Sequence, residues 1–108
     1  MAELRAKIEA AFDNVINARK QLLDAKEAVI SSKEKLKDQE AGLILNGMIV
    51  GKNEAERSAS MRSQTIKWRD DLLEAEKSER VATLALEIAL DARRNLESML
   101  RIEELEAI

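Results

Sequence analysis

Mostly apolar or small residues recur along the first half of the chain at alternating spacings of four and three positions. The members of this repeat are Leu4, Ile8, Ala11, Val15, Ala18, Leu22, Ala25, Val29, Ser32, Leu36, Gln39 and Leu43. An average spacing of 3.5 residues, kept over about six heptads, is typical of the seam of a left-handed coiled coil. The pattern therefore predicts one long helix over about residues 2–44.

The second half of the chain shows the same alternating spacing of four and three positions. Its seam consists of Met61, Thr65, Trp68, Leu72, Ala75, Glu79, Ala82, Leu86, Ala89, Arg93, Leu96 and Leu100. This spacing predicts a second helix over about residues 53–106. In the first seam one column is large and the other mostly small, and in the second seam Ala recurs every seven residues at 75, 82 and 89. Small residues that face each other allow two helices to approach closely. We expect Trp68 to be a core residue, and the polar members Glu79 and Arg93 to lie at a solvated edge or to fix the register.

All three glycines lie between residues 42 and 51, and the chain has no proline. They predict a turn over about 45–52, with Asn46-Gly47 as a turn or helix C-cap. Asn53, with Glu56 three positions later, predicts the N-cap of the second helix. The expected fold is therefore all-α: a single domain over 1–108 with two long antiparallel helices, an Ala-rich coiled-coil hairpin. Folding near residue 50 places Ala18 opposite Ala82.

The turn region permits a second interpretation. The apolar triplets 43–45 and 48–50 flank Asn46-Gly47, which is the sequence preferred in two-residue β-hairpins. An isolated hairpin is marginal in water, so a turn between helices is favoured. The apolar segment 43–50 then either caps the helical hairpin or docks a partner.

Each helix also carries apolar residues outside its seam. A helix that is apolar on more than one side must be covered on more than one side. We therefore expect a homodimer or higher homo-oligomer, with two hairpins forming a four-helix bundle, although an unidentified protein partner would serve equally well. The predicted interaction face comprises Ile16, Leu23, Ile30, Leu84, Ile88, Met99, Ile102 and Leu105. Segment 101–108 extends past the hairpin, and we expect a second subunit or a partner to cover it.

The amino-acid composition limits the chemical functions that the chain can perform. The chain has no His and no Cys, which excludes imidazole and thiolate catalysis and ordinary zinc sites. The carboxylates form no recognisable catalytic or metal-binding pattern, so we expect a protein that is not an enzyme and needs no cofactor. No stretch reaches the roughly 18–20 apolar residues that span a bilayer, and we expect a cytoplasmic protein without a membrane partner.

Charge leaves one alternative function open. The net charge is −3, which disfavours nucleic-acid binding. However, basic residues gather near the predicted turn, interleaved with acidic ones: Lys33, Lys35, Lys37, Lys52, Arg57, Arg62, Lys67 and Arg69. The alternative is thus a nucleic-acid-associated protein that uses this end. Segment 47–52 lacks the spacing and the hydroxyl residue of a phosphate-binding loop.

The segment Gly51-Lys52-Asn53-Glu54-Ala55-Glu56-Arg57 precedes an Ala-, Leu- and Glu-rich helix. It resembles short proteins encoded by phages and prophages, in which a Gly-Lys-Asn-x-x-x-Arg turn joins two long helices. The resemblance covers about residues 42–75. It implies a small accessory phage protein without enzymatic activity, acting in a bacterial host, and it transfers no functional residues.

Overall fold

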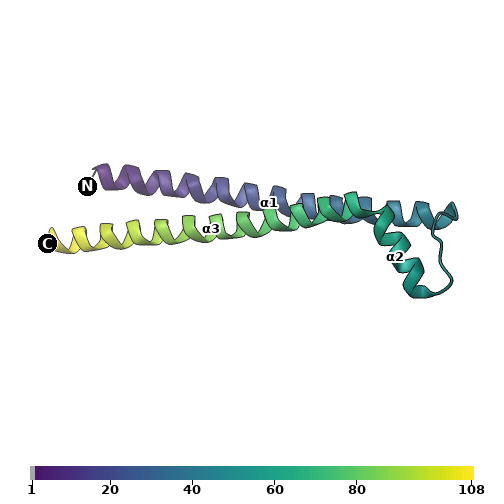
Figure 1. The fold of residues 1–108 in the computed structure, drawn as a ribbon. Helices are drawn as coiled ribbons and strands as arrows, with labels where there is room; N and C mark the ends of the chain where they lie inside the picture. The colour runs from purple at the N-terminus through teal and green to yellow at the C-terminus, as the bar shows by residue number, and fades with distance from the viewer. Residues whose placement is uncertain (1) are drawn as a thin grey trace. The chain divides into compact units, whose positions relative to one another are not determined.

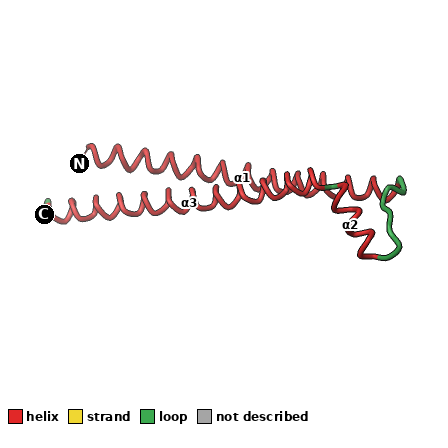
Figure 2. Tube along the Cα trace, viewed as in Figure 1, coloured by secondary structure: helices red, strands yellow, loops and turns green. Residues whose placement is uncertain are grey.

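The computed structural model describes residues 2–108 and is α-helical. Helix α1 comprises Ala2–Leu45, α2 comprises Glu54–Gln64 and α3 comprises Ile66–Glu106 (Figure 1). Within the described residues no strand is present, and the remaining segments are loops and turns (Figure 2). The all-α prediction is confirmed, and the alternative β-hairpin around Asn46-Gly47 is wrong.

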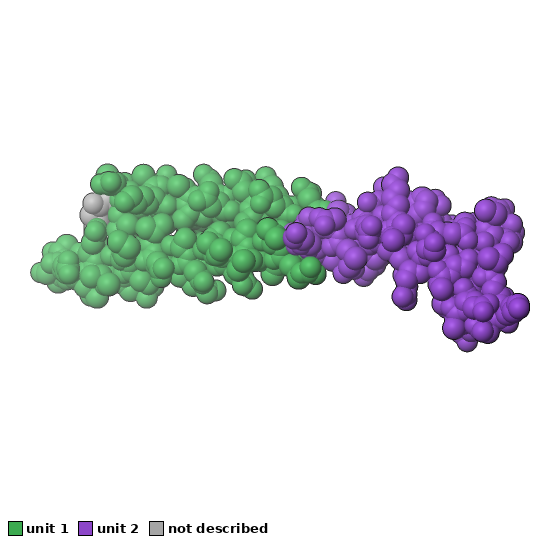
Figure 3. All heavy atoms as spheres, in the orientation of Figure 1, with its two compact units in different colours: residues 1–24, 79–108 green, residues 25–78 purple. Residues whose placement is uncertain are grey.

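The described chain divides into two compact units (Figure 3), and the single helical-hairpin domain stays a prediction. Unit 1 contains residues 2–24 and 79–108, and unit 2 contains Ala25–Ser78. In unit 1 the first part of α1 and the last part of α3 run antiparallel (Figure 1). Unit 2 contains the end of α1, the loop, α2 and the start of α3.

Burial follows the two predicted seams. Among the described residues, the buried apolar side chains are Leu4, Ala11, Val15, Ala18 and Val29, and all five belong to the seam of α1. Val15 is the most enclosed of them, with 1% of its surface exposed. All twelve seam positions from Met61 to Leu100 are buried or half-buried. In α1 the exception is Gln39, which is exposed while the next residue, Glu40, is half-buried.

The end of α1 is a glycine C-cap, as the sequence predicts. Gly47 has a φ of 66°, in the left-handed region. The Gly47 N–H donates to the Ile44 carbonyl at 3.1 Å, and the Met48 N–H donates to the Leu43 carbonyl at 2.9 Å. These two bonds form a Schellman motif, which satisfies carbonyls that the helix end would otherwise leave free.

The start of α2 is also capped as predicted. The Asn53 side-chain Oδ1 accepts a hydrogen bond from the Glu56 N–H at 2.9 Å. The Glu56 carboxylate accepts from the Lys52 N–H at 2.7 Å, one residue earlier than in a standard capping box. Gly51 lies against this first turn with a φ of 155°, and a Cβ at that position would be 2.7 Å from the Arg57 nitrogen. The helix therefore requires glycine there.

The helix predicted over 53–106 is divided at Thr65, which corrects the sequence interpretation. Thr65 is fully buried, and its hydroxyl donates to the Met61 carbonyl at 2.7 Å. The same hydroxyl accepts from Nε of Arg69 at 2.9 Å. A threonine that bonds the carbonyl four residues earlier bends a helix. Helix α2 accordingly departs from the axis of α3 at this residue (Figure 1).

Candidate functional site

The apolar stripe of α1 outside the seam is uncovered. Ile16 is 47% exposed, Leu23 58% and Ile30 57%. The first two belong to unit 1 and Ile30 belongs to unit 2. Phe12, which the sequence analysis did not include, is also exposed and lies one helical turn before Ile16. The structure therefore leaves this predicted surface free.

The corresponding residues of α3 are uncovered as well. Each of the five predicted interaction residues on this helix is more than half exposed: Leu84, Ile88, Met99, Ile102 and Leu105. All residues of segment 101–108 are exposed, so no part of unit 1 covers it. Exposed apolar side chains of this kind are typical of surfaces that bind other proteins.

The stripes of α1 and α3 lie on opposite sides of the helix pair. Ile16 and Leu23 each directly follow a seam residue, whereas Val81 and Ile88 each directly precede one. Seen from one end, antiparallel helices wind in opposite senses. Residues that follow the seam in both helices therefore share one side, and residues that precede it share the other.

An ion pair in unit 2 illustrates this rule. Glu40 follows the seam position Gln39, and Arg69 follows Trp68. The Glu40 Oε1 and an Arg69 terminal nitrogen are 3.5 Å apart, so both residues lie on the same side of the seam. The eight predicted interaction residues consequently do not form one face. In unit 1, Ile16 and Leu23 are on one side, Ile88, Met99 and Ile102 are on the other, and Leu84 and Leu105 point away from the seam. Ile30 belongs to unit 2.

The polar seam residue Arg93 lies at the edge of the seam. Its guanidinium is 5.1 Å from the centroid of the Phe12 ring, and its Nε is 3.6 Å from the Glu97 carboxylate. The predicted register places Arg93 opposite Ile8, one helical turn before Phe12. Helical side chains tilt toward the N-terminus of their own helix. In an antiparallel pair, long side chains therefore meet across the seam although their backbones are about a turn out of register, as those of Arg93 and Phe12 are. The pairing of Ala18 with Ala82 stays a prediction.

The apolar loop does not cap the helices with most of its side chains. Leu45, Met48 and Val50 are exposed, and Ile49 is half-buried. The loop is instead held by polar bonds to α2. The Gln64 side-chain amide donates to the Met48 carbonyl at 2.8 Å, and the Val50 N–H donates to the Ser60 hydroxyl at 3.4 Å.

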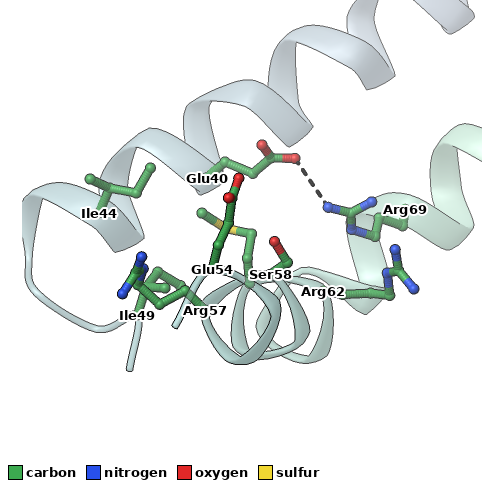
Figure 4. Close-up of a pocket in the computed structure, with 9 residues that line it drawn as sticks. Glu40, Ile44, Ile49, Glu54, Arg57, Ser58, Arg62 and Arg69 are labelled. Atoms are coloured by element: carbon green, nitrogen blue, oxygen red, sulfur yellow. Dashed lines mark hydrogen bonds and ion pairs between the residues drawn. The ribbon is translucent and has the colours of Figure 1, made fainter. Parts of the chain in front are cut away.

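These bonds leave an open pocket of about 620 Å³ in unit 2, between the end of α1, the loop, α2 and the start of α3 (Figure 4). Its apolar lining is Ile44, Ile49 and Met61. Its polar lining is Glu40, Glu54, Arg57, Ser58, Arg62 and Arg69. The sequence indicated the arginines but not the pocket, because the pocket depends on how the loop folds back onto α2.

The pocket mixes charges of both signs. Arg69 is already bound to Glu40 and to the Thr65 hydroxyl, and Glu54 also lines the cavity. Phosphate groups favour a surface dominated by positive charge. The pocket therefore gives limited support to the predicted nucleic-acid alternative, and it brings together only three of the eight predicted basic residues.

Among residues 2–108, no three acidic side chains gather closely enough to hold a metal ion. Within the same part of the chain, no helix is sufficiently long and apolar to span a membrane.

Comparison with known proteins adds no family to this description. No protein-family model, curated protein or solved structure matches the chain.

Proposed function

We propose that the protein is a non-enzymatic interaction module of the structural, scaffold or inhibitor type, which works by self-association of its helices. The observation that carries this proposal is the exposure of the two apolar stripes. Leu23 and Ile88 are each nearly 60% exposed, although neither belongs to a loop or a helix end. Burying such a side chain contributes roughly 1.5–3 kcal/mol, which favours a second set of helices as cover.

The simplest assembly is a four-helix bundle made by two hairpins. A second hairpin packed on one side of unit 1 covers one stripe only, because the two stripes lie on opposite sides. The stripe that remains exposed is then available for a further copy or for a protein partner. This arrangement suits a scaffold, since association through one side leaves the other side free.

The resemblance of segment 51–57 to phage and prophage proteins extends the proposal. A small helical accessory protein that acts in the bacterial cytoplasm by binding other subunits needs no catalytic group. The proposed function is therefore compatible with the absence of His and Cys from the sequence.

Thermal unfolding at several protein concentrations tests self-association. Assembly stabilises the folded chain by mass action, so the Tm should rise between about 2 and 200 µM. The double variant Leu23→Glu with Ile88→Glu should lose this dependence, because it places a charge in each stripe. A matched control, Ala6→Glu with Ser98→Glu, adds the same charge at exposed positions outside both stripes. If the wild-type Tm is independent of concentration, the proposal is wrong.

Nucleic-acid association is the second candidate, and the three arginines of the pocket are its specific support. The net charge of −3 and the two pocket carboxylates oppose it. A gel-shift assay at 50 and 200 mM salt separates the two functions. We expect no complex at either concentration, whereas binding that weakens steeply with salt would favour the alternative.

A further inference from the structure

One side of unit 1 is free of charged side chains over most of its length. It consists of the residues that precede the seam in both helices. On α1 these are Ala10, Asn14, Asn17 and Gln21, and on α3 they are Val81, Ala85, Ile88, Ala92, Asn95, Met99 and Ile102. All of them are exposed except Ala85, which is half-buried. We call this set of residues the uncharged face.

The opposite side of unit 1 differs sharply. There, charged residues interrupt the apolar stripe at nearly every turn: Arg5, Glu9, Arg19, Arg80, Glu87, Arg94, Glu97 and Arg101. Charges next to the uncharged face lie at its ends and along its outer edges: Glu3 and Lys7 flank one end, Asp24 flanks the other, and Asp13, Lys20 and Asp91 border the outer edges. Protein interfaces show the same distribution, with few charges at the centre and polar groups at the rim.

The side chains of the uncharged face are suited to contact an identical surface. Ala10, Ala85 and Ala92 permit close approach of two helix pairs. The amides of Asn14 and Asn17 each carry both donors and an acceptor, so they can bond equivalent amides of a second copy. An isologous contact through this face keeps its centre free of charged side chains, whereas a contact through the opposite side would have to remove arginines and glutamates from water.

The size of the face can be compared with that of known dimer interfaces. At 1.5 Å per residue its α3 part, 81–102, extends about 33 Å and its α1 part, 10–21, about 18 Å. With helices of about 10 Å diameter, the two parts together cover about 500 Å² per copy. Stable interfaces bury about 800 Å² per partner, so the face supplies more than half of a standard interface and the polar residues at its edges can supply the rest.

We infer that a second copy of this chain packs on the uncharged face in a two-fold symmetric contact. The inference rests on the proposed self-association and specifies which of the two sides mediates it. The stripe containing Ile16 and Leu23 lies outside this contact and remains accessible in the dimer.

Single charge substitutions on the two sides test this assignment. Ile88→Glu places a carboxylate midway along the uncharged face, and Leu23→Glu is the matched control on the other side. Because a two-fold interface contains each change twice, Ile88→Glu should weaken dimerisation at least about hundredfold. Leu23→Glu should change the dimerisation constant less than about threefold. Sedimentation velocity measures both constants, and circular dichroism verifies that each variant is helical.

Three results overturn the inference, and they are distinguishable. If Leu23→Glu dissociates the oligomer and Ile88→Glu does not, self-association stands but uses the other side. If neither variant changes association, self-association stands and a different surface mediates it. If the wild-type chain itself does not associate, the proposed function fails together with this assignment.

Thiol labelling provides a readout that does not depend on a disruptive substitution. The chain contains no cysteine, so a single introduced thiol is the only one. In Ala92→Cys, labelling by a maleimide should slow at least about tenfold between low and high protein concentration. In Leu23→Cys it should be equally fast at both. Equal labelling of Ala92→Cys at both concentrations, in a chain that dimerises, contradicts the assignment.

Discussion

Phe12 and Arg93 are in cation–π contact, with the guanidinium 5.1 Å from the ring centroid. Phe12 directly follows the buried seam residue Ala11, and Arg93 is itself a seam residue of α3. The contact therefore joins the first part of α1 to the last part of α3 at the edge of their shared seam. It contributes about 0.5–1 kcal/mol at a partly exposed site.

This contact leads to a prediction about the register. When the tilt of both side chains is allowed for, the contact between Phe12 and Arg93 places Ala18 within about a helical turn of Ala82 and more than two turns from Ala75. The variant with cysteines at 18 and 82 should therefore form a disulfide under mild oxidation much faster than the variant with cysteines at 18 and 75. Non-reducing electrophoresis measures both. Faster crosslinking between 18 and 75 would mean a register shifted by about one heptad.

The seam should dominate the stability of the helix pair. Val15 is almost completely enclosed, so Val15→Ala should lower the free energy of unfolding by about 2 kcal/mol. Leu73→Ala is a suitable control, because Leu73 is 62% exposed and lies outside the seam. Its effect should stay below about 0.5 kcal/mol. Urea unfolding at one fixed protein concentration measures the two values, and equal losses would contradict the described packing.

Substituting alanine for either of two glycines should change the stability of the chain in opposite directions. Gly51→Ala adds a Cβ that is 2.7 Å from the Arg57 nitrogen, at a φ of 155°. It should destabilise the chain by about 1–3 kcal/mol. Gly42 lies inside α1 with no atom within 4 Å of an added Cβ, so Gly42→Ala should stabilise by about 0.5–1 kcal/mol. Thermal unfolding distinguishes the two, and a stabilising Gly51→Ala would show that the loop is arranged differently.

Segment 101–108 should contribute to assembly rather than to helix formation. Its residues are all exposed, and Ile102 and Leu105 provide apolar surface without cover in unit 1. Deleting the segment should lower the Tm of the oligomer by several degrees while reducing helicity only by the loss of about two turns. Substituting Glu103 and Glu104 with Gln is a control that keeps the apolar residues, and it should retain the Tm. An unchanged Tm after deletion would mean that the segment is a solvated tail.

The seams and the helix ends could be predicted from the sequence, because each depends on local spacing or on a few adjacent residues. The column containing Val15 is recognisable from its seven-residue repeat, and Gly47 and Asn53 have the ordinary chemistry of caps. The division at Thr65 could not be predicted in this way. The segment has no glycine or proline near it, and the bend depends on a hydroxyl that bonds both Met61 and Arg69.

The candidate site was only partly predictable for a related reason. The exposed residues were identified because hydrophobic residues outside a seam need cover. Their separation onto two sides follows from the antiparallel pairing, which reverses the sense of one helix relative to the other. The pocket in unit 2 depends on the bond from Gln64 to the Met48 carbonyl, a contact between residues 16 positions apart that no spacing rule indicates.

Sedimentation equilibrium of the wild-type chain tests the central claim, self-association, most directly. One chain has a mass of 12.1 kDa, so monomer and dimer are readily separated. We predict a weight-average mass of at least a dimer at tens of micromolar, falling toward the monomer value on dilution. A mass of one chain throughout that range would contradict the account.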